Sequence, residues 1–318
     1  MSEENNQWER KLLEKLASEA LVEQRRKRRW GIFFKVIGFV YVGVIIVSAL
    51  GLASPASLEV NRHTALVDLE GVISSDSTAS ADRINSSLRS AFESEGSVGV
   101  ILRINSPGGS PVQAGLINNE IKRLRAKYPE KPFYAVVEEM CASGGYYVAV
   151  AADKIYADQA SLVGSIGVVM NGFGFTGAMD KLGVERRLIT SGENKGFLDP
   201  FSKVNPYEVE FAKQMAEEIH KQFIQVVKQG RGEKLSQNPE LFSGLVWTGA
   251  KSVELGLIDE LGSIDTVARD VLKAEKILDY TEQDSFAERF AERVGVVFGL
   301  GVRSVFPEIG GRQNLGFQ

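Results

Sequence analysis

The chain has 318 residues, of which 44% are hydrophobic and 25% charged, and its formal net charge is −4. This length and apolar content suffice for one large or two modest folded domains, which excludes a disordered chain. The small net charge gives no global attraction to nucleic acid. Cys141 is the only cysteine, so an intramolecular disulfide and a zinc site of paired thiolates are excluded, and two histidines argue against an all-histidine metal site. We therefore expect no metal, no cofactor and no nucleic-acid partner.

The first part of the chain resembles a membrane anchor. Apolar residues recur at helical spacing within residues 1–24, a basic cluster follows at 25–29, and an uncharged apolar run covers 36–53. About 20 apolar residues cross a bilayer, so this run predicts a transmembrane helix. Because the basic cluster precedes the run, the positive-inside rule keeps the N-terminus in the cytoplasm and everything after residue 54 outside. A cleaved signal peptide and a buried core helix are the alternatives, but about 30 preceding residues are long for a cleaved signal.

We expect a cytoplasmic segment (1–30), a transmembrane anchor (31–53), a linker (54–62), a large domain (63–280) and a C-terminal tail (281–318). Within the large domain, short apolar runs alternate with amphipathic stretches. The pattern predicts strands at 65–73, 98–104, 133–137, 166–170 and 184–190, and helices at 80–92 (capped by Ser80), 112–128 and 206–229. Such alternation is typical of an α/β domain with a largely parallel sheet.

Two glycine-rich turns follow predicted strands. The first, at 105–110, reads Asn-Ser-Pro-Gly-Gly-Ser, and the second, at 141–147, reads Cys-Ala-Ser-Gly-Gly-Tyr-Tyr. Ligands gather outside the carboxyl ends of parallel strands, and adjacent glycines let backbone N–H groups approach a substrate. Ser143 would stand at a helix N-terminus, where partial positive charge favours a developing alkoxide. The simpler readings are an ordinary Pro-Gly turn and a serine that only caps the helix.

A serine nucleophile needs a general base, and histidine is a poor candidate here. His63 lies at the edge of the linker and His220 lies within the long predicted helix, so neither is on a turn at the carboxyl ends of the strands. A lysine can serve instead when burial lowers its pKa from about 10.4 to roughly 7–8. Lys195 ends the loop Ser-Gly-Glu-Asn-Lys that follows a predicted strand, although most lysines of this kind are simply at the surface.

Taken together, these motifs resemble the signal-peptide peptidase A (SppA) type of serine peptidases, within the ClpP/crotonase superfold. The resemblance runs from about Ala65 to Val271. It rests on five motifs in order: SPGG at 106–109, ASGGYY at 142–147, GSIGV at 164–168, the Ser-Gly-x-x-Lys loop at 191–195, and Gly-Leu-Ile-Asp-x-Leu-Gly at 256–262. The implied fold is a series of repeated ββα units with a largely parallel sheet.

The resemblance implies a role for each motif. Ser143 would be the nucleophile, Lys195 the general base and Ser165 the hydroxyl that orients the lysine, while the N–H groups of Gly108 and Gly144 would form the oxyanion hole. Two departures from the family pattern are Cys141, at a position usually taken by a small residue, and Gly196 directly after the lysine. A thiol peptidase would use Cys141 but lacks a partner histidine.

The resemblance also implies an environment and partners. Single-length members form a dome-like homo-oligomer that brings serine and lysine together from neighbouring subunits, so the two side chains need not meet within one chain. The implied substrates are cleaved signal peptides and other short hydrophobic peptides, cut outside the cytoplasm at the inner or plasma membrane. The alternatives are a crotonase-like acyl-CoA enzyme, which would need acid/base carboxylates in place of Ser143, and a non-catalytic membrane scaffold of the same fold.

Overall fold

The computed structural model describes residues 25–45 and 62–283. Two units, Met1–Val60 and Asn61–Gln318, are compact by themselves. In the first unit, the described residues 25–45 are helical, include the basic cluster and expose large apolar side chains such as Phe39. Among the described residues, no helix has the length and apolar character that crossing a bilayer requires. Residues 46–53 of the expected span, the amphipathic stretch 1–24 and the tail beyond 283 lie outside the described residues.

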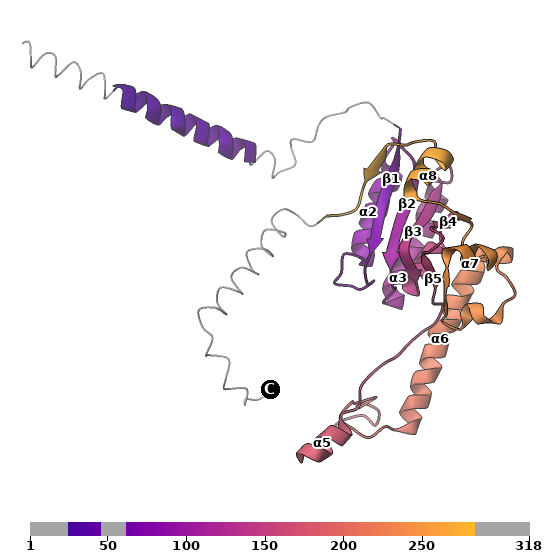
Figure 1. The fold of residues 1–318 in the computed structure, drawn as a ribbon. Helices are drawn as coiled ribbons and strands as arrows, with labels where there is room; N and C mark the ends of the chain where they lie inside the picture. Colours follow the sequence, from indigo (N-terminus) through magenta and orange to yellow (C-terminus); the bar gives the residue numbers. More distant parts are fainter. Residues whose placement is uncertain (1–24, 46–61, 284–318) are drawn as a thin grey trace, which may run out of the picture. The chain divides into compact units, whose positions relative to one another are not determined.

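The second unit is built on an eight-stranded, mostly parallel sheet (Figure 1). The strand order is β6-β5-β3-β2-β1-β8, with β4 between β3 and β7. Every pairing is parallel except that of β5 with β6. The strands are β1 (His63–Glu70), β2 (Ser97–Ser106), β3 (Phe133–Ala142), β4 (Lys154–Ala157), β5 (Leu162–Gly164), β6 (Val246–Thr248), β7 (Glu260–Leu261) and β8 (Ile277–Asp279).

The central strands are buried on both faces, which explains why they read as continuous apolar runs. In β2, the side chains of Val100, Leu102 and Ile104 join the main core, whereas Ile101 between them joins a second cluster. The main core lies under α2 (Ala81–Glu93), α3 (Pro111–Lys127) and α4 (Gly144–Ala149), and α8 (Ile264–Thr266) and η3 (Val267–Val271) cover part of the other face. The mixed α/β architecture with its mostly parallel sheet fits the expected ClpP/crotonase-like fold.

Most of the predicted elements before residue 140 are confirmed, with small differences at their ends. The helix predicted at 80–92 is α2, and Ser80 is its N-cap residue as predicted, although the Ser80 side chain makes no capping hydrogen bond. Ser110 does cap α3 by accepting a hydrogen bond from the N–H of Gln113. The structure extends the strand predicted at 133–137 to Ala142, so that β3 delivers the chain directly to Ser143.

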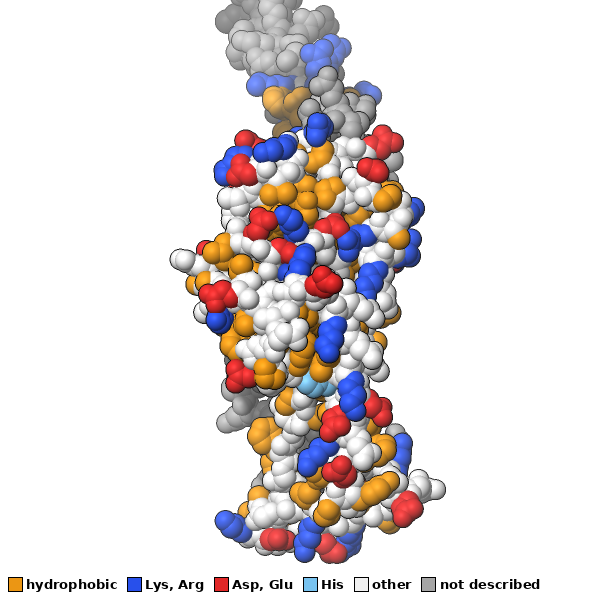
Figure 2. Space-filling view, turned by 90° about the vertical axis from the view of Figure 1, so that its right-hand side faces the viewer, with side chains coloured by type: hydrophobic (Ala, Val, Ile, Leu, Met, Phe, Trp, Pro, Cys, Tyr) orange, Lys and Arg blue, Asp and Glu red, His pale blue; other side chains and the backbone are white. Residues whose placement is uncertain are grey.

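The two strands predicted at 166–170 and 184–190 are wrong. Both segments are irregular, and the intervening helix α5 (Thr176–Leu182) has no buried residue. These segments lie in an arm, residues 167–216, that extends from the sheet and returns along α6 (Pro206–Arg231) (Figure 1). Their apolar side chains suggested strands, but these segments pair with no sheet edge. Ile166 is buried in the main core, whereas side chains further along stay exposed, as in Val169 at 81% and Ile189 at 95%. Figure 2 shows apolar side chains interleaved with charged ones over this end of the molecule.

Candidate active site

Ser143 occupies a sharp turn between a buried strand and a helix. β3 ends at Ala142 and α4 begins at Gly144, and Ser143 between them has φ 51° and ψ −119°. Residues other than glycine rarely adopt positive φ. Such a strained backbone conformation persists only where the surrounding structure fixes it. The N–H of Ser143 donates to the carbonyl of Gly164 at 2.9 Å. Its side chain makes no capping hydrogen bond, so the reading of Ser143 as an ordinary helix cap is not supported.

The first glycine turn lies directly against this serine. A Cβ built on Gly108 would stand 2.7 Å from the Cβ of Ser143 and 2.7 Å from the backbone nitrogen of Gly144. Only glycine permits so close an approach, and the φ of Gly108, 101°, also favours glycine. The structure therefore brings together Ser143, Gly108 and Gly144, which the sequence placed on two separate turns.

The N–H of Gly108 already has a partner. It donates to the Oγ of Ser106 at 3.1 Å, and that hydroxyl donates to the carbonyl of Gly71 at 2.6 Å. Ser106 is fully buried and fixes the turn from within. The expected use of the Gly108 N–H in an oxyanion hole thus requires this bond to break.

Gly109 offers a better placed N–H. The N–H of Ile73 donates to the carbonyl of Gly108, and the N–H of Ser110 donates to the carbonyl of Ile73. In parallel pairing these two bonds flank Gly109, whose own N–H therefore points away from Ile73. A Cβ on Gly144 would lie 3.2 Å from the nitrogen of Gly109, so the two glycine nitrogens share one neighbourhood.

Ser165 stands next to Ser143 through the backbone. It follows Gly164, whose carbonyl accepts the N–H of Ser143, and its own N–H donates to the carbonyl of Leu245 at 2.8 Å. Its φ is 49°, so Ser143 and Ser165 are two of the four non-glycine residues with positive φ in the described ranges. Both serines are partly exposed, and strained backbone at partly exposed residues of neighbouring turns is typical of functional sites.

Lys195 lies in the arm, after the irregular segment 184–190. It is exposed in the arm, in a turn where its N–H donates to the carbonyl of Gly192 at 3.1 Å. Within the described residues no hydrogen bond joins it to Ser143. That a neighbouring chain completes the pair stays a prediction.

The motif at 256–262 contacts α4, the helix that follows Ser143. The hydroxyl of Tyr146 in α4 donates to the carbonyl of Leu257 at 2.7 Å, and burial raises the pKa of this tyrosine. Asp259 accepts from the buried Arg231 at 2.7 Å and from Lys234 at 2.7 Å. Burial raises the pKa of Asp259, but the hydrogen bonds from Arg231 and Lys234 outweigh it and lower the pKa overall. We assign this motif a structural role.

Cys141 cannot replace Ser143 as nucleophile in this conformation. Its side chain is fully buried in the main core, and burial raises the pKa of the thiol far above its usual value. The reactive form of a cysteine is the thiolate, which this environment suppresses.

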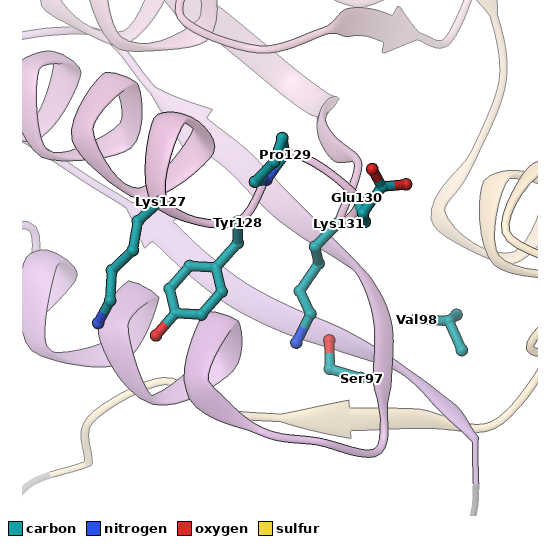
Figure 3. Close-up of a pocket in the computed structure, with 7 residues that line it drawn as sticks. All are labelled: Ser97, Val98, Lys127, Tyr128, Pro129, Glu130 and Lys131. Carbon is teal, nitrogen blue, oxygen red and sulfur yellow. The ribbon is translucent and has the colours of Figure 1, made fainter.

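Two pockets differ in their position relative to the proposed catalytic residues. A pocket of about 470 Å³ (Figure 3) lies at the start of β2 and in the loop before β3. Ser143 lies at the other end of these parallel strands. Its lysines already have partners: Lys131 donates to the carbonyls of Phe92 and Ser94, and Lys127 pairs with Glu93 at 3.6 Å. A larger pocket of about 600 Å³ lies in the arm between α6 and the loops around it, and Gly196, next to Lys195, lines it.

Sequence reasoning missed two residues that shape the site. Ser106 was read only as part of the glycine turn, although its place after a buried strand could have indicated a buried hydroxyl. His220 was set aside as a base, yet its Nε2 lies 3.1 Å from the carbonyl oxygen of Ile166, next to Ser165. No local signal links residues 166 and 220, because only tertiary folding brings them together.

Comparison with known proteins gives one family. Residues 125–278, which contain Ser143, Ser165 and Lys195, match the model of Peptidase family S49. The chain is 32% identical over 240 residues to Protease 4 of Haemophilus influenzae, a match that covers 73% of this chain and 37% of that protein. It is 33% identical over 185 residues to the chloroplastic serine protease SPPA of Arabidopsis thaliana, covering 58% of this chain and 27% of that protein.

Another similar protein has a different name. The chain is 49% identical over 177 residues to the Na(+)/H(+) antiporter NhaA of Brucella melitensis, a match that covers 56% of this chain and 24% of the antiporter. The name of that protein describes ion transport. Less than a quarter of that protein is similar to this chain. The chain spans less than half the length of each of these three relatives.

Proposed function

The chain belongs to peptidase family S49 and is of its SppA type, and from this premise we propose that it is a serine endopeptidase with Ser143 and Lys195 as its catalytic dyad. The observation that carries the proposal is the strained turn at Ser143, packed against Gly108 and Gly144 and joined by a hydrogen bond to Gly164. A backbone strained in this way, beside glycine N–H groups, suits nucleophilic attack on a carbonyl.

The proposed reaction has two halves. The neutral amine of Lys195 takes the Ser143 proton as Oγ attacks the peptide carbonyl, and the resulting ammonium gives a proton to the leaving amine. The acyl-enzyme is then hydrolysed by a water that loses its proton to the same amine. Ser165 orients the lysine through its hydroxyl.

For the oxyanion hole we propose the N–H groups of Gly144 and Gly109. The expected donor Gly108 donates to Ser106, whereas the Gly109 N–H points away from Ile73 and its nitrogen lies near Gly144. Donors fixed in advance at this place stabilise the charge that develops on the carbonyl oxygen.

We also propose that the complete site forms between two copies of the chain. Lys195 is exposed on an arm rich in exposed apolar side chains, among them Phe173, Leu182 and Ile189. Large apolar side chains left exposed in this way are typical of a surface that a protein partner covers. A neighbouring chain would supply its Lys195 to this chain's Ser143 in a homo-oligomeric ring.

Membrane anchoring and hydrophobic peptide substrates complete the proposal. The basic start of helix 25–45 and its exposed apolar side chains support an anchor with a cytoplasmic N-terminus and an extracytoplasmic peptidase domain. The apolar pocket beside Gly196 supports substrates with hydrophobic side chains, such as signal-peptide remnants.

The direct test uses Ser143→Ala and Lys195→Ala in the full chain. We expect both to lower hydrolysis of a fluorogenic peptide by roughly 10³-fold or more while the fold is kept, because each removes a member of one catalytic unit. A fluorophosphonate should label the wild type but not Ser143→Ala. Wild-type turnover by either variant would exclude the dyad, and absence of labelling in an intact wild type would favour a non-catalytic scaffold.

A further inference from the structure

His220 connects α6, the longest helix within the described ranges, to the loop that carries Ser165. α6 has 26 residues, and its buried side chains, Phe223, Val227 and Arg231, all lie in its C-terminal part. His220 lies one turn before Phe223 and is half-buried. It is therefore at the point where α6 leaves the body of the domain and continues as the exposed arm.

Toward its C-terminus, α6 packs on the helix that follows the nucleophile. The rings of Phe223 and Tyr147 are 5.2 Å apart, and a Cβ on Gly230 would meet the carbonyl oxygen of Val150 at 2.2 Å. Residues 220, 223, 227 and 230 recur every three or four positions, so His220 lies on the same face of the helix. This face fixes α6 to α4, which Ser143 begins.

Toward its N-terminus, α6 holds the loop of Lys195. Glu208 accepts the N–H of Leu198 at 2.9 Å, and the rings of Phe211 and Phe197 meet edge to face at 5.8 Å. Phe197 and Leu198 follow Lys195 by two and three residues. One helix thus carries the loop of the predicted base at one end and supports the nucleophile at the other.

The hydrogen bond of His220 has a defined direction. Its Nε2 lies 3.1 Å from the carbonyl oxygen of Ile166. A carbonyl only accepts, so Nε2 must carry the proton in either charge state of the ring. The carbonyl belongs to the residue directly after Ser165, whose φ of 49° needs support from its surroundings.

We propose that His220 is a positioning residue that fixes the Ser165 segment against α6 and thereby sets where the Ser165 hydroxyl meets the lysine. This inference rests on the proposed function, because it assigns His220 an effect on the same site. His220 does not touch the substrate and acts only through the backbone at Ile166. Removing its donor should therefore lower kcat more than it changes KM.

The test compares His220→Gln with His220→Met in the full chain. The two substituted side chains have similar length, but only the amide can donate to the Ile166 carbonyl. One lost hydrogen bond at this place should lower kcat about tenfold in His220→Met with KM changed less than about twofold, whereas His220→Gln stays within about threefold of wild type. Gln222→Leu, on an exposed position of the same helix, is the control and should keep wild-type kinetics.

A double-mutant cycle tests whether the effect passes through Ser165. In a Ser165→Ala background, His220→Met should lower kcat by less than about twofold, because the hydroxyl that it positions is already gone. An undiminished tenfold loss in that background would overturn the proposal. So would wild-type kcat in folded His220→Met, or a large loss of kcat in folded His220→Gln.

The outcomes separate this inference from the proposed function. If wild type hydrolyses peptide and Ser143→Ala does not, the dyad holds whatever the His220 variants do. Thermal unfolding of each variant identifies a loss of kcat that is only a loss of fold. Should His220→Met unfold, near-wild-type kcat in His220→Gln still supports the proposal and a large loss still overturns it.

Discussion

Ser143 and Ser165 have backbone conformations that ordinary side chains avoid. Their φ values are 51° and 49°, and the hydrogen bond from Ser143 to Gly164 ties the two turns together. Leu198, three residues after Lys195, is a third non-glycine residue with positive φ. Strain of this kind costs on the order of 1–3 kcal/mol per residue and persists where the surrounding structure imposes it. Its gathering around the proposed catalytic residues supports their assignment.

Replacing Ser143 should separate stability from activity. We expect Ser143→Gly to unfold at a higher temperature than Ser143→Ala, because glycine adopts φ 51° without steric cost. The difference in unfolding free energy should be roughly 1 kcal/mol. Both variants should be inactive. Differential scanning calorimetry of the two proteins makes the comparison, and a less stable Ser143→Gly would show that the turn holds no such strain.

The close contact of α6 with α4 is the main constraint at the level of elements. In Gly230→Ala the new methyl group would meet the Val150 carbonyl oxygen at 2.2 Å, so the helices must move apart. We expect a loss of roughly 1–3 kcal/mol in unfolding free energy, measured by urea denaturation. Gly115→Ala in α3 is the matched control, because nothing lies within 4 Å of the new Cβ, and it should stabilise by up to about 1 kcal/mol. Equal effects of the two substitutions would contradict this packing argument.

A buried carboxylate joins α2 to α3 and makes stability depend on pH. Glu120 accepts hydrogen bonds from Arg123 and from Arg89, and these, led by that from Arg123, lower its pKa to about 2. Since the folded pKa lies below the ordinary value of about 4.3, this stabilisation is present above that value and is lost as the pH falls toward 2. Wild type should therefore lose more unfolding free energy than Glu120→Gln between pH 4.5 and 2. Chemical denaturation across this range gives both slopes, and parallel curves would contradict the assignment.

For the whole molecule, the decisive question is whether one chain or two complete the site. Lys195 is exposed and has no hydrogen bond to Ser143 within the described residues. If a neighbouring chain supplies the lysine, mixing Ser143→Ala with Lys195→Ala before assembly should restore about a quarter of wild-type activity, since a random ring pairs two intact residues at about that fraction of interfaces. Each variant alone should remain inactive. A mixture as inactive as its components would place both residues in one chain.

Local pattern determined much of the sheet and the motifs. Buried strands such as β2 gave continuous apolar runs, the amphipathic stretch 112–128 predicted α3, and the glycine turns pointed to Ser143 and its neighbours as candidates. The family was also readable, because its motifs occur in order along the chain. Each of these signals depends only on neighbouring residues, through strand period, capping or turn chemistry.

Tertiary structure decided what depends on distant neighbours. The apolar segments 166–170 and 184–190 resemble strands, but they lie in an arm with no edge to pair with. The N–H of Gly108 has its partner in Ser106, and His220 meets Ile166 across 54 positions. The sequence by itself determined which side chains are candidates for the chemistry, because residue type and local turns are local properties. Which backbone groups face them follows from packing between segments far apart in the chain, and so only the folded molecule decided it.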